Sequence, residues 1–415
     1  MAHRRIALTE LKVGMYVVGI DRPWLHTPFL RNKFKVRDRD DIASLRRSGV
    51  AEVTIDTEQG LDCVSASDHL PASTSQGEGP QGTPSVPEIA SIRPAAALSA
   101  SALADNLALA KERRTEWMGR LNRLFDGTRT TGVVSYGEAC QLVEDMIGVL
   151  LERQTACYAV MSLQESDPTL CDHGVTVSML SIILGQALGY SRESLRQVGV
   201  GALLHDVGLT RLPRNLTKRA KSMTAAQTAL FDSHPNQGIV ILEKSGISDQ
   251  VIVSVLRHHH DVIDVSVSSD ALPAGSPLPS RIVGIVDQYD ELMNGQSGLP
   301  PMSPSQAMTQ LYQRVQREPS LQESVSHLIR TLGVFPLYSL VVLNTGEWGV
   351  VGAITPGKAH LPTVYLFRDS HGRASVPPIE VDLSLEPKEG RAIHTVLDPR
   401  RERVDIETIL RQVAA

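Results

Sequence analysis

The sequence predicts a mainly α-helical protein with a small α+β domain at its N-terminal end and a small β-rich extension at its C-terminal end. Three observations support this fold class. Residues 96–334 are dominated by helical patterns, in which apolar residues recur every three or four positions. Short alternating segments typical of strands occur before and after this stretch. A segment rich in Ser, Pro, Gly, Ala and Gln separates the first domain from the helices.

Length and composition narrow the class of protein. A chain of 415 residues is too long for one ordinary core, and 42% hydrophobic with 21% charged residues is typical of a globular protein. The formal net charge of −5 argues against a nucleic-acid polymer as partner, although a local basic pocket could still bind a phosphate. No stretch approaches the roughly 18 uninterrupted apolar residues of a membrane span. The four cysteines have neither paired nor metal-like spacing, so we expect reduced thiols and a cytoplasmic protein.

The first domain is expected to span residues 1–63. Strand-like segments occur at 15–18 and 51–56, and a helical pattern covers 40–48. Residues 64–95 are predicted to form a flexible linker, because such a composition cannot bury enough apolar surface to offset its ordering entropy.

The helical domain is expected over residues 96–334. Its first part, 96–125, is rich in Ala and Leu and could be an entry helix or the interface of a homodimer. In the C-terminal extension, residues 335–415, the residue pattern becomes typical of β-strands. Residues 339–343 and 348–351 flank an Asn-Thr-Gly turn and predict a hairpin, and 363–367 and 379–381 would add strands.

Histidines and aspartates interrupt the apolar stripes of the helical domain. His173 precedes Val177 at helical spacing, and Asp287 follows Val283. Polar groups on core-facing stripes are costly unless they are paired or bind a metal. Taken singly, His173 would more often be an ordinary core histidine, and Asp287 could be an ion-pair partner. Taken together, such residues indicate a shared ligand. The candidates are His173, His205, Asp206, His234, His258, His259 and Asp287.

This residue set suits two divalent transition-metal ions. Neutral imidazoles bind Fe, Mn, Ni or Zn, and a carboxylate can bridge two ions. Mixed His and Asp ligation accommodates several of these metals, so the sequence predicts a two-metal site without selecting the metal.

Four segments within the helical domain resemble the HD-GYP subgroup of the HD-superfamily metal-dependent phosphohydrolases. They are residues 203–208, 233–235, 257–259 and 281–290, and they match in residue type, order and spacing. The segments 13–15 and 22–29 resemble an uncharacterised domain often fused ahead of such modules, and 346–351 resembles the small β extension that often follows. The resemblance implies an HD-type all-α bundle that hydrolyses cyclic di-GMP, or a related nucleotide, in bacterial signalling.

The resemblance also implies roles for individual residues. Asp206 would bridge both ions. His173, His205 and Asp287 would complete one coordination sphere, and His234, His258 and His259 would complete the other. Asp206 and His205 would be the catalytic residues. The two ions would activate water for in-line attack on phosphorus.

The chain departs from the family pattern at four places. The Gly-Tyr-Pro tripeptide is absent from residues 264–273, Leu209 replaces the usual Lys, and His260 replaces the usual Glu. Thr169 replaces a Glu that holds a third metal in some members, which argues for two ions. We therefore expect slow hydrolysis. The main alternative is a catalytically weak, metal-binding receptor of cyclic di-GMP or a module that interacts with signalling proteins. A phosphohydrolase of other nucleotides is a further alternative.

Overall fold

The computed structural model describes most of the helical part of the chain and parts of the N-terminal domain. The described residues are 3–20, 34–36, 42, 45–46, 50–57, 60–61, 99–163, 169–213, 216, 223–261, 278–295, 300–315, 319–354, 358–386 and 390–413. The predicted linker, the segment 22–29 and the segment 264–273 lie outside them, as does most of the predicted helix 40–48.

The chain divides into two compact units, Met1–Ile92 and Arg93–Ala415. The first unit contains an antiparallel sheet with strand order β1-β4-β2-β3. Its strands are β1 (His3–Ala7), β2 (Tyr16–Ile20), β3 (Phe34–Lys35) and β4 (Glu52–Asp56), with a short 3-10 helix η1 (Leu8–Glu10) after β1. Val17, Val53 and Ile55 face a small apolar core that includes Met15 and Leu45. The strands predicted near residues 15–18 and 51–56 are therefore present.

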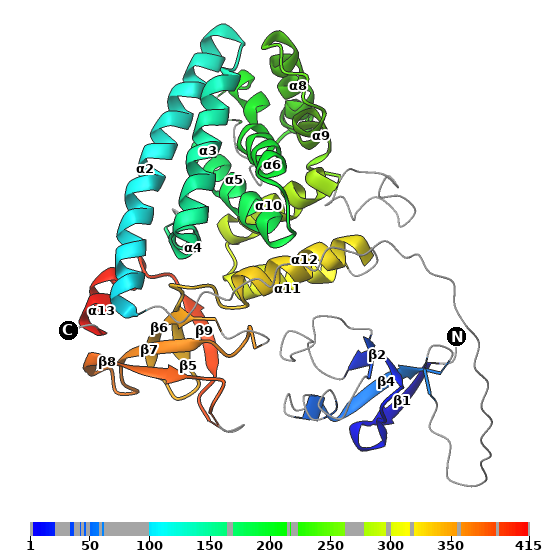
Figure 1. Ribbon diagram of the computed structural model, residues 1–415, viewed down its shortest axis with the longest axis vertical. Coiled ribbons are helices and arrows are strands. Elements are labelled where there is room, and N and C mark those ends of the chain that lie inside the picture. The colour runs from blue at the N-terminus through cyan, green and yellow to red at the C-terminus, as the bar shows by residue number, and fades with distance from the viewer. Residues whose placement is uncertain are drawn as a thin grey trace, which may run out of the picture. The chain divides into compact units, whose positions relative to one another are not determined.

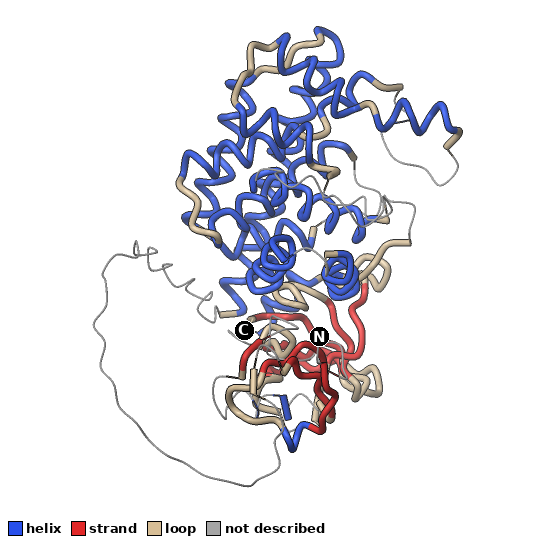
Figure 2. The backbone as a smooth tube through the Cα atoms, turned by 90° about the vertical axis from the view of Figure 1, so that its right-hand side faces the viewer, coloured by secondary structure: helices blue, strands red, loops and turns tan. Residues whose placement is uncertain are grey.

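The second unit is built mainly from helices (Figures 1 and 2). They are α2 (Ala100–Thr131), α3 (Tyr136–Glu152), α4 (Gln154–Ser162), α5 (Leu170–Ala187), α6 (Arg192–Leu204), η3 (Val207–Arg211), α7 (Ala225–Asp232), α8 (His234–Lys244), α9 (Gln250–His258), α10 (Leu278–Asn294), α11 (Pro304–Arg314), α12 (Pro319–Leu332) and α13 (Ile406–Val413). The free cysteines Cys140, Cys157 and Cys171 lie in these helices.

Helix α5 is the central helix of this unit. It contacts α2, α3, α4, α6, α10 and α12, and its residues from Cys171 to Gly185 are buried all round. Within the described residues it alone is long and apolar enough to cross a membrane, but 83% of it is buried inside the unit. Its hydrophobicity is therefore that of a core helix.

A second antiparallel sheet follows the helices, with strand order β8-β7-β6-β5-β9. Its strands are β5 (Leu340–Leu343), β6 (Trp348–Ala353), β7 (Thr363–Arg368), β8 (Ala374–Asp382) and β9 (Ile393–Leu397). The predicted hairpin is present as β5 and β6.

The sheet is joined to the bundle through α13, which contacts β7, β8 and α2. Lys111 of α2 pairs with Glu407 of α13 at 2.8 Å. The predicted fold class, a helical core with a small N-terminal sheet and a β-rich C-terminal extension, is confirmed.

Candidate metal centre

Five helical segments bring all of the predicted histidines and aspartates except His258 together. His173 lies in the first turn of α5, and His205 and Asp206 follow the end of α6. The remaining groups come from the start of α8 (His234), the end of α9 and the middle of α10 (Asp287). Because helix ends and a short 3-10 segment supply most of these groups, the site depends on how the helices pack.

Gly208 sets the distance between η3 and α8. A Cβ atom at this position would lie 1.9 Å from the carbonyl oxygen of His234 and 2.7 Å from the backbone nitrogen of Gly238. Only glycine permits so close an approach of two backbones. The contact places Asp206, two residues earlier, beside His234.

The first cluster consists of His173, His205 and Asp287. Each offers one ligand atom, and these atoms lie within 4.8 Å of one another. The Nε2 atom of His173 is 3.2 Å from Nε2 of His205 and 3.0 Å from Oδ1 of Asp287. All three side chains are buried.

The second cluster consists of Asp206, His234, His259 and His260, whose ligand atoms also lie within 4.8 Å of one another. The Nε2 atom of His234 is 3.4 Å from Nε2 of His259 and 3.2 Å from Nε2 of His260. The Oδ1 atom of Asp206 lies 3.1 Å from Nε2 of His234.

Asp206 faces both clusters. While Oδ1 points at the second cluster, Oδ2 lies 3.5 Å from Nε2 of His205 and 3.8 Å from Nε2 of His173. A carboxylate with one oxygen toward each group of donors has the geometry of a bridging ligand.

His258 does not join either cluster. Its Nδ1 atom lies 2.6 Å from Oδ2 of Asp261, and its side chain is 33% exposed. His260, which we did not select from the sequence, lies in the second cluster instead. Three consecutive histidines contain two possible adjacent pairs, and the structure brings together His259 and His260. If His259 and His260 are the pair, the residue that follows it is Asp261, which carries a carboxylate like the Glu usual at that place in the resembled family.

Main-chain carbonyl groups orient three of the imidazoles. The Nδ1–H groups of His205, His234 and His259 donate to the carbonyl oxygens three residues earlier, those of Ala202 at 2.7 Å, Phe231 at 2.8 Å and Leu256 at 3.0 Å. A carbonyl oxygen can only accept, so Nδ1 carries the proton and Nε2 presents a lone pair to the clusters. This is the tautomer that binds a metal through Nε2.

His173 is oriented by a carboxylate. Its Nδ1–H donates to Oδ2 of Asp290 at 2.7 Å, and the side-chain amide of Asn294 donates to the same oxygen at 2.9 Å. Asp290 is completely buried. Asp290 and Asn294 were not identified from the sequence, although Asp290 follows Asp287 by three residues on the same apolar helix.

The pKa values of the cluster residues are shifted by burial and by the charges of their neighbours. Burial lowers the pKa of His173, but the adjacent carboxylates of Asp287 and Asp290 outweigh it and hold that pKa well above its ordinary value. Burial raises the pKa of Asp206, but the surrounding histidines, His205 first, hold it well below its usual range. In the second cluster, burial and the neighbouring His260 keep the pKa of His259 well below its ordinary value. His259 is thus neutral and available as a ligand.

The donor set fits bound cations. Asp287 is 1% exposed, and neither of its oxygens accepts a well-formed hydrogen bond from a described residue, although Oδ1 is only 3.0 Å from Nε2 of His173. With Nδ1–H donated to Asp290 and the pKa of the ring raised, this Nε2 holds a second proton in the metal-free protein, and it would present a lone pair once a cation displaced that proton. A buried carboxylate beside imidazole nitrogens requires a compensating positive charge, which protons supply in the metal-free protein and cations would supply when bound. Two His/Asp clusters of this kind are consistent with a binuclear metal site.

A further carboxyl lies one turn beyond Asp287. Burial, followed by the charge of Asp287, raises the pKa of Glu291 to about 8. The side-chain amide of Gln288 donates to Oε2 of Glu291 at 2.8 Å, and Arg314 donates to Oε1 of Gln288. This protonated carboxyl was also missed, because its helical pattern alone does not separate it from an exposed surface Glu.

Two positions that differ from the resembled family have structural roles. The Thr169 hydroxyl caps α5 by accepting a hydrogen bond from the backbone N–H of Asp172 at 3.1 Å. Leu209 is 1% exposed and packs with Leu212 and Phe231 in a small apolar cluster. The ring of Phe231 in turn contacts the ring of His234, with centroids 5.3 Å apart.

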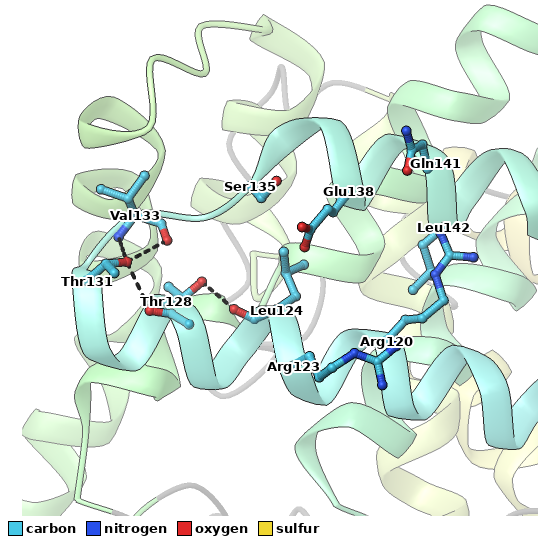
Figure 3. A pocket seen from close by; sticks show the side chains of 11 residues that line it. Arg120, Arg123, Leu124, Thr128, Thr131, Val133, Ser135, Glu138, Gln141 and Leu142 are labelled. Carbon is cyan, nitrogen blue, oxygen red and sulfur yellow. Dashed lines mark hydrogen bonds between the residues drawn. The ribbon is translucent and has the colours of Figure 1, made fainter.

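A separate pocket of about 490 Å³ lies between α2 and α3 (Figure 3). Arg120 and Arg123 line it from α2, and Glu138 and Gln141 line it from α3. Arg120 also pairs with Asp145 of α3. No predicted metal ligand lines this pocket, so it is distinct from the two clusters.

Comparison with known families agrees with the fold and the site. Residues 158–319 match the HD domain, and residues 3–139 match a domain of unknown function, DUF3391. The chain thus contains an HD domain preceded by a domain of the DUF3391 type. This confirms the resemblance drawn from the sequence motifs.

The relatives of this chain include characterised phosphodiesterases. It is 26% identical over 388 residues to the cyclic di-GMP phosphodiesterase PA4108 of Pseudomonas aeruginosa, which covers 92% of this chain and 89% of the relative. It is 26% identical over 165 residues to the cyclic di-GMP phosphodiesterase response regulator RpfG of Xanthomonas campestris, covering 39% of this chain and 43% of the relative. Among solved structures, the HDG"Y"P protein Bd1817 of Bdellovibrio bacteriovorus matches with a TM-score of 0.44 at 18% identity, covering 79% of this chain and 98% of that one.

Proposed function

We propose that this protein is a two-metal phosphodiesterase that hydrolyses cyclic di-GMP in the bacterial cytoplasm. The observation that carries the proposal is the pair of His/Asp clusters that share Asp206. The homology to the cyclic di-GMP phosphodiesterase PA4108 supports the choice of substrate.

In this proposal the ligands of the first ion are His173, His205, Asp206 and Asp287, and those of the second are Asp206, His234, His259 and His260. When bound, such ions provide Lewis acidity and lower the pKa of coordinated water, which is the chemistry that phosphodiester hydrolysis needs. His258 is left out of the ligand set because its Nδ1 atom is bound to Asp261.

The protein side chains have their own tasks. The backbone carbonyls and Asp290 orient four of the five imidazoles, those of His173, His205, His234 and His259, so that Nε2 faces the ions. The buried positions of His173, His205 and Asp287 limit the access of bulk water to the first cluster. Burial and the charge of Asp287, one helical turn away, raise the pKa of Glu291 to about 8 in the metal-free protein.

The test is an activity assay on protein loaded with Mn²⁺ or Fe²⁺ under anaerobic conditions. Cyclic di-GMP is incubated with the protein, and the linear dinucleotide and GMP are separated by chromatography. We expect slow product formation that Asp206→Ala abolishes and that His258→Ala leaves largely intact. Absence of product with any metal would overturn the proposal.

The second candidate is a metal-binding receptor that binds the nucleotide, or a protein signalling partner, without efficient turnover. The observation that favours it is the burial of Leu209 in an apolar cluster, because this position then supplies no cation to a substrate phosphate. The proposed domains are an N-terminal domain (1–63), a linker (64–95), a helical domain (96–334) and a C-terminal extension (335–415). Nucleotide binding to the helical domain would be signalled through the linker to the N-terminal domain. Tight binding of cyclic di-GMP without product would favour this candidate.

A further inference from the structure

The two clusters differ in the charge that surrounds them. The first cluster contains the carboxylate of Asp287 and also faces Oδ2 of Asp206. The second cluster contains three histidines and Asp206 as its only carboxylate. A divalent ion in the first cluster is therefore neutralised more fully by its direct neighbours.

The outer partners of the histidines add to this difference. His205, His234 and His259 donate their Nδ1–H groups to neutral carbonyl oxygens, whereas His173 donates to the buried carboxylate of Asp290. A carboxylate partner makes an imidazole a stronger base and a better metal ligand. Among these four, the first cluster holds the one imidazole strengthened in this way.

Helix α10 approaches both sides of the same imidazole ring. Asp287 lies 3.0 Å from Nε2 of His173, and Asp290 lies 2.7 Å from its Nδ1. Residues three apart share one helix face, so a single helix sets both contacts. Asn294, one turn further on, donates to Asp290 and fixes the carboxylate.

We infer that Asp290, held by Asn294, is a positioning residue that makes the first cluster the tighter of two unequal metal positions, so that this cluster fills first. The oxygen-richer first cluster would also favour a harder ion such as Mn²⁺, and the histidine-rich second cluster would favour a borderline ion such as Zn²⁺. The inference rests on the proposed metal ligands and is independent of nucleotide turnover.

The test is a titration of metal-free, full-length protein with Mn²⁺. Isothermal calorimetry measures the binding steps, and electron paramagnetic resonance separates free from bound Mn²⁺. We expect two binding steps of different affinity. Asp290→Asn keeps an oxygen for the Nδ1–H of His173 but removes the charge, so the first step should weaken about 10- to 100-fold while the second changes little. Equal affinities in the wild-type protein, or an unchanged first step in the variant, would overturn the inference.

Two further variants separate positioning from a general structural effect. Asp172→Asn removes another buried carboxylate beside His173, but one that faces Arg114. This control should lower stability without selectively weakening the first step. Asn294→Ala should weaken the first step less than Asp290→Asn, and it remains informative if the latter folds poorly.

A spectroscopic readout tests the orientation directly. Nitrogen-15 NMR of the histidine rings in the metal-free protein should show His173 with Nδ1 protonated, unchanged in Asp290→Asn and altered in Asp290→Leu. If His260→Ala, rather than Asp290→Asn, removes the tighter step, the order of filling is the reverse of the one inferred here. Because no nucleotide is present, either result is independent of the phosphodiesterase proposal.

Discussion

At the scale of single residues, the direction of an imidazole decides whether it can bind a metal. His258 and His260 lie two residues apart in one run of three histidines, yet their environments differ. His258 is paired with Asp261 at the surface of the helix, whereas Nε2 of His260 lies 3.2 Å from Nε2 of His234. A rotation of about 100° per residue along a helix separates their directions.

This difference gives the first prediction. His260→Ala should reduce the metal content from about two ions per chain to about one, because the second cluster loses one of its three imidazoles. His258→Ala is the matched control and should retain both ions. Elemental analysis after loading and gel filtration measures the result, and an equal loss in the two variants would contradict the assignment.

Leu209 provides the second prediction. Restoring the family Lys at this position places an ammonium group into the apolar cluster with Leu212 and Phe231. We expect Leu209→Lys to lower the free energy of unfolding by about 2–4 kcal/mol and to leave the rate of hydrolysis unimproved. Chemical denaturation with Leu209→Met as the control checks this, and faster turnover without loss of stability would show that the side chain can reach the substrate.

At the scale of elements, the packing of η3 against α8 positions Asp206. The two backbones touch at Gly208, where no side-chain atom fits between them. Leu209 of η3 also packs with Phe231 of α7, and the ring of Phe231 contacts His234 at the start of α8. The short 3-10 segment therefore transmits the position of α8 to the bridging carboxylate.

The third prediction tests this contact. Gly208→Ala adds a Cβ atom 1.9 Å from the His234 carbonyl oxygen, so the two elements must move apart. We expect a loss of about 1–3 kcal/mol of stability or more, together with a lower occupancy of the second cluster. Gly148→Ala in α3, where nothing lies within 4 Å of the added atom, is the control and should be neutral or stabilising. Full metal content in Gly208→Ala would argue against this role of the contact.

At the scale of the whole molecule, bound ions would tie together five segments of the helical unit. The proposed ligands come from α5, the α6–η3 junction, α8, the C-terminal end of α9 and α10, which are distant in the sequence. The first unit has its own apolar core. Metal binding should therefore raise the unfolding temperature of the helical unit and leave that of the first unit unchanged.

The fourth prediction concerns the pH dependence of this stabilisation. In the metal-free protein the pKa of His173 is held well above its ordinary value, so Nε2 carries a proton at neutral pH that an ion must displace. The metal affinity should therefore fall as the pH is lowered, by up to about tenfold per pH unit for one displaced proton. Scanning calorimetry with and without Mn²⁺ between pH 8 and pH 6 should show a shrinking stabilisation, and a constant one would contradict the proton assignment.

The sequence alone determined the fold class, the hairpin of β5 and β6, and six of the seven residues that enter the two clusters. These features are readable because local patterns carry them. Apolar periodicity reports which residues face a core, and a His or Asp on such a face is conspicuous. Turn residues between alternating segments likewise report a hairpin.

Only the tertiary structure decided which neighbouring histidine enters the second cluster, that Leu209 is a core residue, and that Asp290 and Asn294 support His173. Each depends on the rotation of a helix end or on contacts between helices far apart in the sequence, such as α5 with α10. One residue of shift along a helix turns a side chain by about 100°, which spacing alone cannot resolve at the end of α9. The residue types of the site can thus be predicted from the sequence. Which of the adjacent histidines enters the second cluster, and which residues hydrogen-bond to His173 from outside the first cluster, depend on how the helices pack.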